Sequence, residues 1–160
     1  MPAKAPIAGL IILLITFAAC DREGKGGEEG IAVSYAQAAK APAWMDKLAG
    51  YLPALGHRNW IVVADSAFPL QISPGIETIV TGEDHFAVLD KVLRAVDGAK
   101  HIRPKIWLDK ELGFVTEDLA PGADEAKRRL DEALQGRGAA PVLHEELIAR
   151  LDQAGRAFKI

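Results

Sequence analysis

Short apolar runs alternate with longer helical repeats along most of this chain. Residues 61–64 form a continuous, mostly β-branched run between polar residues, which predicts a strand over 60–64 that is buried on both faces. After Thr81 or Asp84 as a cap, apolar residues recur on one helical face until Gly98 ends the helix. These residues are Phe86, Leu89, Val92, Leu93 and Val96. The pattern therefore predicts a strand, a connecting segment and an amphipathic helix.

The remaining elements follow the same alternation. Helical spacing of apolar residues predicts helices over 34–52, 123–134 and 144–154. Short runs with apolar and β-branched residues predict strands over 76–80 and 105–108. Pro42 marks a break or a first turn in the first of these helices. Strands that alternate with helices favour a single α/β domain over residues 34–160, with a mostly parallel sheet flanked by helices.

The first nineteen residues have the pattern of a secretory signal peptide. Lys4 is followed by an apolar core over 7–19 that ends in small residues. This core is shorter than the roughly 20 apolar residues that a membrane span needs. The chain then reads Thr16-Phe17-Ala18-Ala19-Cys20, which looks like a bacterial lipobox with Phe17 in place of the usual aliphatic residue. We therefore expect cleavage before Cys20.

Cys20 is the only cysteine of the chain, so the chain cannot form an intramolecular disulfide. Lipid attachment at Cys20 explains why an exported protein carries one thiol. The alternative is an incidental cysteine after an ordinary signal peptide or an uncleaved anchor helix. Residues 20–33 are charged and rich in glycine, which predicts a flexible tether. The expected location is the cell envelope, with the domain lipid-anchored to a membrane on its periplasmic or outer face.

The charge balance gives no indication of a nucleic-acid partner. The whole chain carries a net charge of −3, and removing Lys4 with the signal peptide makes the remainder slightly more acidic. Its densest basic cluster, Lys127-Arg128-Arg129, stands among acidic residues and is typical of a solvated helix face. His85 and His101 have no partner at metal-ligand spacing, so we expect surface residues and no metal site.

The predicted strand over 60–64 carries chemistry at both ends. Gly56-His57 precedes it, and Asp65 follows it, four residues before Pro69. Histidine can donate and accept a proton near neutral pH, and a carboxylate at the end of a parallel strand can accept hydrogen bonds from sugar hydroxyls. Spacing alone also allows a simpler interpretation, in which His57 caps the preceding helix and Asp65 caps a turn.

This arrangement resembles the sugar mutarotases of the ribose-pyranase and fucose-mutarotase family. The resemblance covers roughly residues 44–97 and includes Gly56-His57, the strand, Asp65 and the Phe68-Pro69 turn. It implies that His57 is the catalytic acid and that Asp65 contacts the sugar. Further along, His144-Glu145-Glu146-Leu147 resembles the place of another sugar-contacting residue, although His144 can equally cap the last helix.

The resemblance implies an isomerase that interconverts sugar anomers, or pyranose and furanose forms, without metal or cofactor. It also implies homo-oligomers, with a monosaccharide as the other partner. Family members continue through a strand into a Tyr-x-Asn segment, so the strand predicted at Phe158-Lys159-Ile160 is either incomplete or a short or frayed end. The alternative function is a non-catalytic sugar-binding or scaffold lipoprotein with the same fold. A third alternative is an envelope structural domain without a ligand.

Overall fold

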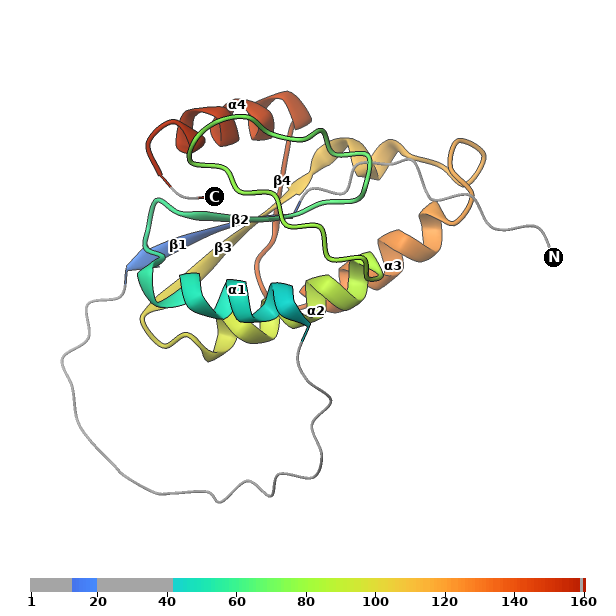
Figure 1. Cartoon of the computed structure of the whole chain (residues 1–160). Coiled ribbons are helices and arrows are strands. Elements are labelled where there is room, and N and C mark those ends of the chain that lie inside the picture. Colours follow the sequence, from blue (N-terminus) through green and yellow to red (C-terminus); the bar gives the residue numbers. More distant parts are fainter. Residues whose placement is uncertain (1–12, 20–41, 159) are drawn as a thin grey trace, which may run out of the picture.

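The computed structural model describes residues 13–19, 42–158 and 160 of the chain. Within these residues the strands are β1 (Leu13–Ala19), β2 (Trp60–Val63), β3 (Ile102–Asp109) and β4 (Ala140–Val142). The helices are α1 (Ala43–Tyr51), α2 (His85–Gly98), α3 (Ala123–Leu134) and α4 (His144–Gly155). Two short 3-10 helices, η1 (Leu52–Ala54) and η2 (Lys110–Phe114), follow α1 and β3 (Figure 1).

The four strands form one sheet in the order β2-β1-β3-β4. β1 is antiparallel to both of its neighbours, and β3 and β4 are parallel. β2, β3 and β4 therefore all run in the same direction, with β1 running against them. The predicted α/β domain with helices flanking the sheet is confirmed, and three of the four strands share one direction.

β1 lies within the segment that the sequence predicts to be a signal peptide. Leu13 is aligned with Val63 of β2 on one side and with Leu108 of β3 on the other. The pairing with β3 continues to Ala19, which is aligned with Ile102. These residues are thus the strand that joins β2 to the rest of the sheet. Cys20 and the predicted tether up to residue 33 lie outside the described residues.

The larger core lies on the face of the sheet that α1, α2 and α3 cover. Alternate residues of the strands point into it, because side chains of a strand alternate between faces. They include Ile61 and Val63 of β2 and Ile102 and Ile106 of β3. From the helices come Trp44, Leu89, Val92, Leu93, Val96, Ala126, Leu130 and Leu134. Leu89 has no exposed surface.

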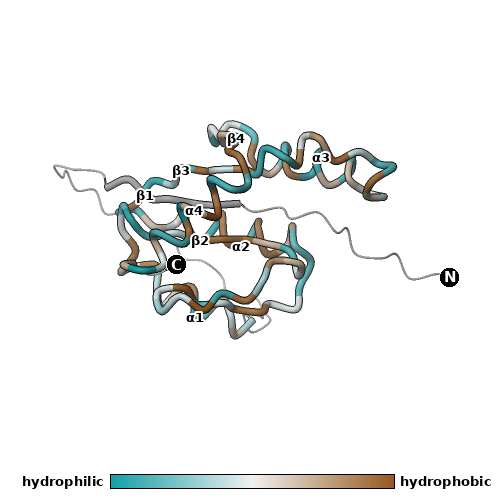
Figure 2. Tube along the Cα trace, turned by 90° about the horizontal axis from the view of Figure 1, so that it is seen from above, coloured by the Kyte–Doolittle hydropathy of each residue, from teal (hydrophilic) through white to brown (hydrophobic). Residues whose placement is uncertain are grey.

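A smaller core lies on the opposite face, under α4 (Figure 1). Leu147 and Leu151 of α4 pack there against Val142, with Trp60 and Trp107 partly buried beside them. Leu147 has no exposed surface. Along the trace in Figure 2, hydrophobic and hydrophilic residues interchange within α3, as expected of a helix with one buried face. The domain therefore has helices on both faces of its sheet.

Several predicted elements are confirmed at or near their predicted ends. β2 covers 60–63, α2 begins after the Asp84 cap and ends at Gly98, and α3 covers 123–134 as predicted. α4 ends at Gly155, one residue beyond the predicted 154. α1 begins at Ala43, directly after Pro42, and ends at Tyr51, so Leu52 of the helix predicted over 34–52 belongs to η1, and residues 34–41 lie outside the described residues.

The strand predicted over 76–80 is wrong. Residues 76–80 have no regular structure, and Val80 is 89% exposed, whereas Ile79 packs against the larger core from a loop. The chain instead bonds to the C-terminal residue. The Glu77 N–H donates to the Ile160 carbonyl (3.1 Å), and the Ile160 N–H donates to the Gly75 carbonyl (2.9 Å). Phe158 is likewise not in a strand in this structure.

Candidate functional site

Polar residues gather where β2, β3 and β4 end. These strands share one direction, so their carboxyl ends meet at one edge of the sheet, where α/β proteins place ligand-binding groups. Asp65 follows β2, Asp109 is the last residue of β3, and His144 comes two residues after β4. We refer to this edge as the carboxyl edge. Neighbouring strands lie about 4.8 Å apart, so the ends of β2 and β3, on either side of β1, lie about 10 Å apart.

Asp109 and His144 form the most defined contact of the carboxyl edge. Nδ1 of His144 lies 2.7 Å from Oδ2 of Asp109. The Asp109 side chain is only 4% exposed, whereas that of His144 is 31% exposed. Asp109 is thereby a buried carboxylate that fixes the orientation of a histidine ring that solvent can reach. With Asp109 ionised, Nδ1 carries the proton and Nε2 presents its lone pair as a base.

The carboxylate of Asp109 is held by the turn that follows β3. Its Oδ1 accepts a hydrogen bond from the Glu111 backbone N–H (2.9 Å), which also caps η2. Burial raises the pKa of Asp109, and the hydrogen bond with His144 opposes that rise. This balance follows from placing a carboxylate in the interior beside a hydrogen-bond donor.

Glu111 lies on the exposed side of the contact between Asp109 and His144. Its Oε2 accepts a hydrogen bond from the backbone N–H of His144 at 2.9 Å, at the first residue of α4. The interaction between the Glu111 and Asp109 side chains lowers the pKa of Glu111 below its usual value and adds to the rise in the pKa of Asp109. A carboxylate at a helix N-terminus is also favoured by the helix dipole. Glu111 therefore fixes the backbone of His144 while Asp109 fixes its ring.

Asp65 occupies the same edge at the end of β2. Its Oδ1 accepts a hydrogen bond from the Ala67 N–H at 2.9 Å, a local turn contact. Its Oδ2 is buried and has no hydrogen-bond partner among the described residues. Asp65, the predicted substrate contact, therefore caps a turn with Oδ1, while Oδ2 remains without a hydrogen-bond donor among the described residues.

His85, the first residue of α2, faces Asp65. Both of its ring nitrogens are buried beside the Ala64 backbone and the Asp65 carboxylate, so the prediction of a surface histidine is wrong. Burial lowers the pKa of His85, while the Asp65 and Asp84 carboxylates oppose that shift. Asp65 Oδ2 and the His85 ring are thus buried polar groups at the same end of the sheet.

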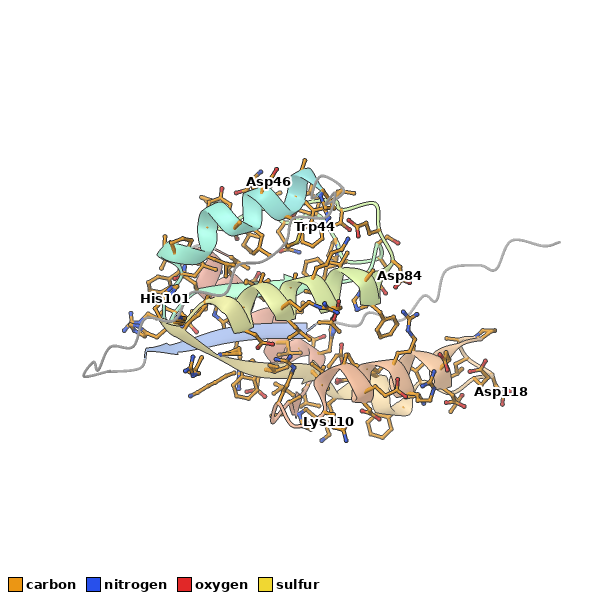
Figure 3. All side chains as sticks on the ribbon, turned by 90° about the horizontal axis from the view of Figure 1, so that it is seen from below. Trp44, Asp46, Asp84, His101, Lys110 and Asp118 are labelled. Atoms are coloured by element: carbon orange, nitrogen blue, oxygen red, sulfur yellow. The ribbon has the colours of Figure 1, made fainter. Side chains whose placement is uncertain are left out.

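His57 lies at the opposite edge of the sheet. It is exposed and precedes β2, whereas Asp65 follows it, and a strand of four residues is about 13 Å long. One copy of the chain therefore does not bring His57 and Asp65 together. His101, which precedes β3, lies at the His57 edge, and Figure 3 shows it at the end of α2 opposite to Asp84.

Trp107 is oriented toward α4 and not toward an open sugar site. The guanidinium carbon of Arg150 lies 4.8 Å from the centre of its ring, a cation–π contact. Its indole N–H is buried and has no partner among the described residues. Since Arg150 covers one ring face, Trp107 belongs to the smaller core.

Sequence reasoning missed Asp109 and misjudged His85. Asp109 ends a strand predicted to stop at Leu108, so the rule that pointed to Asp65 also applies to it. His85 follows the predicted cap Asp84, and its burial depends on packing against the end of β2. Only the first of these two residues carried a signal in the sequence.

Two depressions of the described surface, of about 400 and 270 Å³, include neither Asp65 nor His144. One of about 270 Å³ lies between the end of β3 and α3, beside Asp109 and Lys127. Among the described residues, no three His, Cys, Asp or Glu side chains are placed to hold a metal ion. No helix in the described part of the chain has the length and apolar character to cross a membrane.

Comparison with family models, with curated proteins and with solved structures gives no match to this chain. The geometry of the carboxyl edge is therefore the basis for its functional interpretation.

Proposed function

We propose that this chain is a monosaccharide isomerase of the mutarotase or pyranase type. It interconverts sugar anomers, or pyranose and furanose forms, by general acid–base chemistry. His144 and Asp109 supply the base, and Asp65 binds a sugar hydroxyl. The contact between a buried carboxylate and a solvent-accessible histidine at the carboxyl edge carries this proposal.

Opening a sugar hemiacetal requires one proton to leave the anomeric hydroxyl and one to reach the ring oxygen. Nε2 of His144 accepts the first proton while Asp109 stabilises the imidazolium that forms. The bond between the anomeric carbon and the ring oxygen breaks, and an acid protonates the ring oxygen to give the open-chain carbonyl form. Closure on the other face reverses both transfers, so the enzyme returns to its starting state.

The resemblance assigns the acid role to His57. Because His57 lies at the opposite edge of the same copy, this assignment requires a second copy that brings its His57 to the carboxyl edge. A homo-oligomer is therefore part of the proposal. Asp65, about 10 Å from the end of β3, then accepts a hydrogen bond from a hydroxyl across the sugar ring.

We also propose that the protein is held at the cell envelope by a lipid on Cys20. The lipobox-like sequence before Cys20 and the charged, glycine-rich residues after it support this assignment. Labelling with a radioactive or alkyne-bearing fatty acid tests it, since Cys20→Ser should abolish incorporation. Incorporation into the Cys20→Ser variant would contradict it.

A non-catalytic sugar-binding lipoprotein is the second candidate. The separation of His57 from the carboxyl edge favours it, because a single copy offers only one half of an acid–base pair. This candidate predicts that a monosaccharide binds with heat detectable by calorimetry, while anomer exchange stays at the rate in buffer at every protein concentration.

Saturation-transfer NMR of anomer exchange, run across a panel of aldoses, tests the proposed activity. The unmodified chain should accelerate exchange of at least one sugar, and His144→Gln should lose that acceleration, on the order of 10²–10⁴-fold for a general base. His101→Gln, an exposed histidine at the opposite edge, is the matched control and should retain it. Full activity in His144→Gln would contradict the role of His144, and full activity in His57→Ala would exclude His57 as the acid.

A further inference from the structure

The segment Leu13–Ala19 occupies the middle of the sheet, between β2 and β3. It is aligned with β2 over four residue pairs and with β3 over seven. β2 has no other strand neighbour among the described residues, so β1 alone connects it to β3 and β4. The edges of β2 and β3 that face each other therefore form a site for one antiparallel strand.

The same residues belong to the apolar core of the predicted signal peptide. Cleavage before Cys20 would remove every residue of β1, since the strand ends at Ala19. The backbone groups of β2 and β3 that face β1 would then lose their partners, and unpaired strand edges favour pairing with another chain. A chain can thus use these residues for its sheet or lose them with a leader, but not both.

We propose that the space between β2 and β3 is a strand-accepting site whose occupant is the chain's own segment 13–19, so that completion of the sheet and cleavage at Cys20 exclude each other. Folding of the sheet before export retains the segment as β1. Cleavage acts on chains in which β1 has not paired, and it leaves the site open. This inference bears on the proposed function, because the chain that keeps β1 retains the joined carboxyl edge, whereas the chain cleaved before Cys20 carries the lipid without β1.

Loss of β1 would also affect the carboxyl edge. Asp65 follows β2 and Asp109 ends β3, and β1 holds the two strands at a fixed separation and register. Val63 and Leu108 are both level with Leu13, and Asp65 and Asp109 follow them after two and one residues. Without β1 the Asp65 half of the edge has no strand connection to the Asp109 half.

Disulfide trapping in the full chain tests the occupant. The chain is synthesised without membranes as Cys20→Ser and carries either Leu14→Cys with Val62→Cys or Ile15→Cys with Ile61→Cys, two aligned pairs. Consecutive antiparallel pairs alternate between hydrogen-bonded and closer non-hydrogen-bonded geometry, so at least one of these pairs should form an intramolecular disulfide. The control combines Leu14→Cys with Ile61→Cys, positions that are one residue out of register and should not crosslink.

Intramolecular disulfides confined to the aligned pairs are the expected result. Absence of crosslinks in both aligned pairs, equal crosslinking in the control, or crosslinks only between copies would overturn the assignment.

A second measurement separates a structural strand from a leader that merely lies nearby. Ile15→Pro removes a ladder hydrogen bond from the middle of β1 and should lower the urea midpoint of the full chain. Ala8→Pro, placed before the strand, should leave the midpoint unchanged. An unchanged midpoint in Ile15→Pro would overturn the proposal, because a segment outside the sheet tolerates proline.

Discussion

Asp109 and His144 are separated by 35 positions in the sequence, yet Oδ2 of one lies 2.7 Å from Nδ1 of the other. The parallel pairing of β3 and β4 accounts for this, since Asp109 is aligned with Val142, two residues before His144. The start of α4 then turns the histidine back over the end of β3. The contact is thus produced by the sheet and the first turn of a helix.

Replacing Asp109 with Asn should strongly reduce anomer exchange while the fold is retained. The amide can still contact His144, but it no longer stabilises an imidazolium and favours the other ring tautomer. We expect a loss of about 10²-fold or more, within the range for general acid–base catalysis. The measurement is saturation-transfer NMR together with circular dichroism.

Asp131→Asn, an exposed carboxylate on α3, is the control for Asp109→Asn and should keep the activity of the unmodified chain. Undiminished exchange in Asp109→Asn would show that His144 works without its buried partner.

Much of the fold could be predicted because its signals are local. The Asp84 side chain caps α2 through the N–H groups of Phe86 and Ala87, each at 3.1 Å, and Asp84 was one of the two caps predicted from the sequence. β2 was recognisable as an apolar run, and α3 by its spacing and the preceding Gly122, whose φ is +96°. Such features depend on residues within one or two turns of each other.

The features that were missed depend on contacts between distant segments. β4 has only three residues, with Pro141 at its centre, and is a strand only because β3 lies beside it. β1 resembles a leader in composition, and only its pairing distinguishes the two possibilities. The site was predicted only in part. Asp65 and His144 were marked by the resemblance, and Asp109 ends a strand as Asp65 follows one, but its contact with His144 depends on the pairing of β3 with β4.

Burial of His85 should make the folding free energy depend on pH. Its pKa is lowered by burial in the folded state, whereas in the unfolded chain it is about 6.5. As the pH falls below that value the unfolded state binds the proton more readily, so stability is lost, by at most about 1.4 kcal/mol per pH unit. Stability at pH 7 and above should be unaffected by this group.

Urea unfolding of the unmodified chain and of His85→Gln at pH 7 and pH 5 measures this effect. The loss of stability between the two pH values should be smaller in His85→Gln. The exposed His101→Gln should behave like the unmodified chain. Equal pH dependence in all three proteins would mean that His85 is protonated as easily in the folded state as in the unfolded state.

The ion pair of Asp97 and Arg137 should contribute to stability only above acid pH. The guanidinium donates to both carboxylate oxygens, at 2.8 and 2.7 Å, and joins the end of α2 to the loop after α3. Its hydrogen bonds lower the pKa of Asp97, so the contribution is present above the unfolded aspartate pKa of about 3.9 and is lost as the pH falls through the folded value. Both side chains are partly exposed, so we expect about 0.2–1 kcal/mol at pH 7.

Arg137→Gln tests this contribution in urea unfolding at pH 7 and at pH 3. The difference from the unmodified chain should shrink at the lower pH. Arg94→Gln removes an ion pair within α2, between Arg94 and Asp90, and should cost about 0.3–0.5 kcal/mol at pH 7. A difference for Arg137→Gln that is as large at pH 3 as at pH 7 would rule out the ion pair as its cause.

Gly75 should be the glycine of the described chain least tolerant of alanine. A Cβ there would lie 2.2 Å from the carbonyl oxygen of Phe158 and 2.4 Å from that of Gly155, both of which are backbone atoms that cannot rotate away. The Gly75 N–H also donates to that Gly155 carbonyl at 2.9 Å, so the clash falls on the contact that holds the C-terminal residues. Gly75→Ala should therefore lower the unfolding free energy by about 1–3 kcal/mol, as overpacking does. Gly50→Ala is the matched control, because no atom lies within 4 Å of its added Cβ and its place inside α1 should make alanine stabilising by up to about 1 kcal/mol. Urea unfolding of both variants measures the two signs, and a Gly75→Ala variant as stable as the unmodified chain would show that residues 155–160 do not pack against this loop in solution.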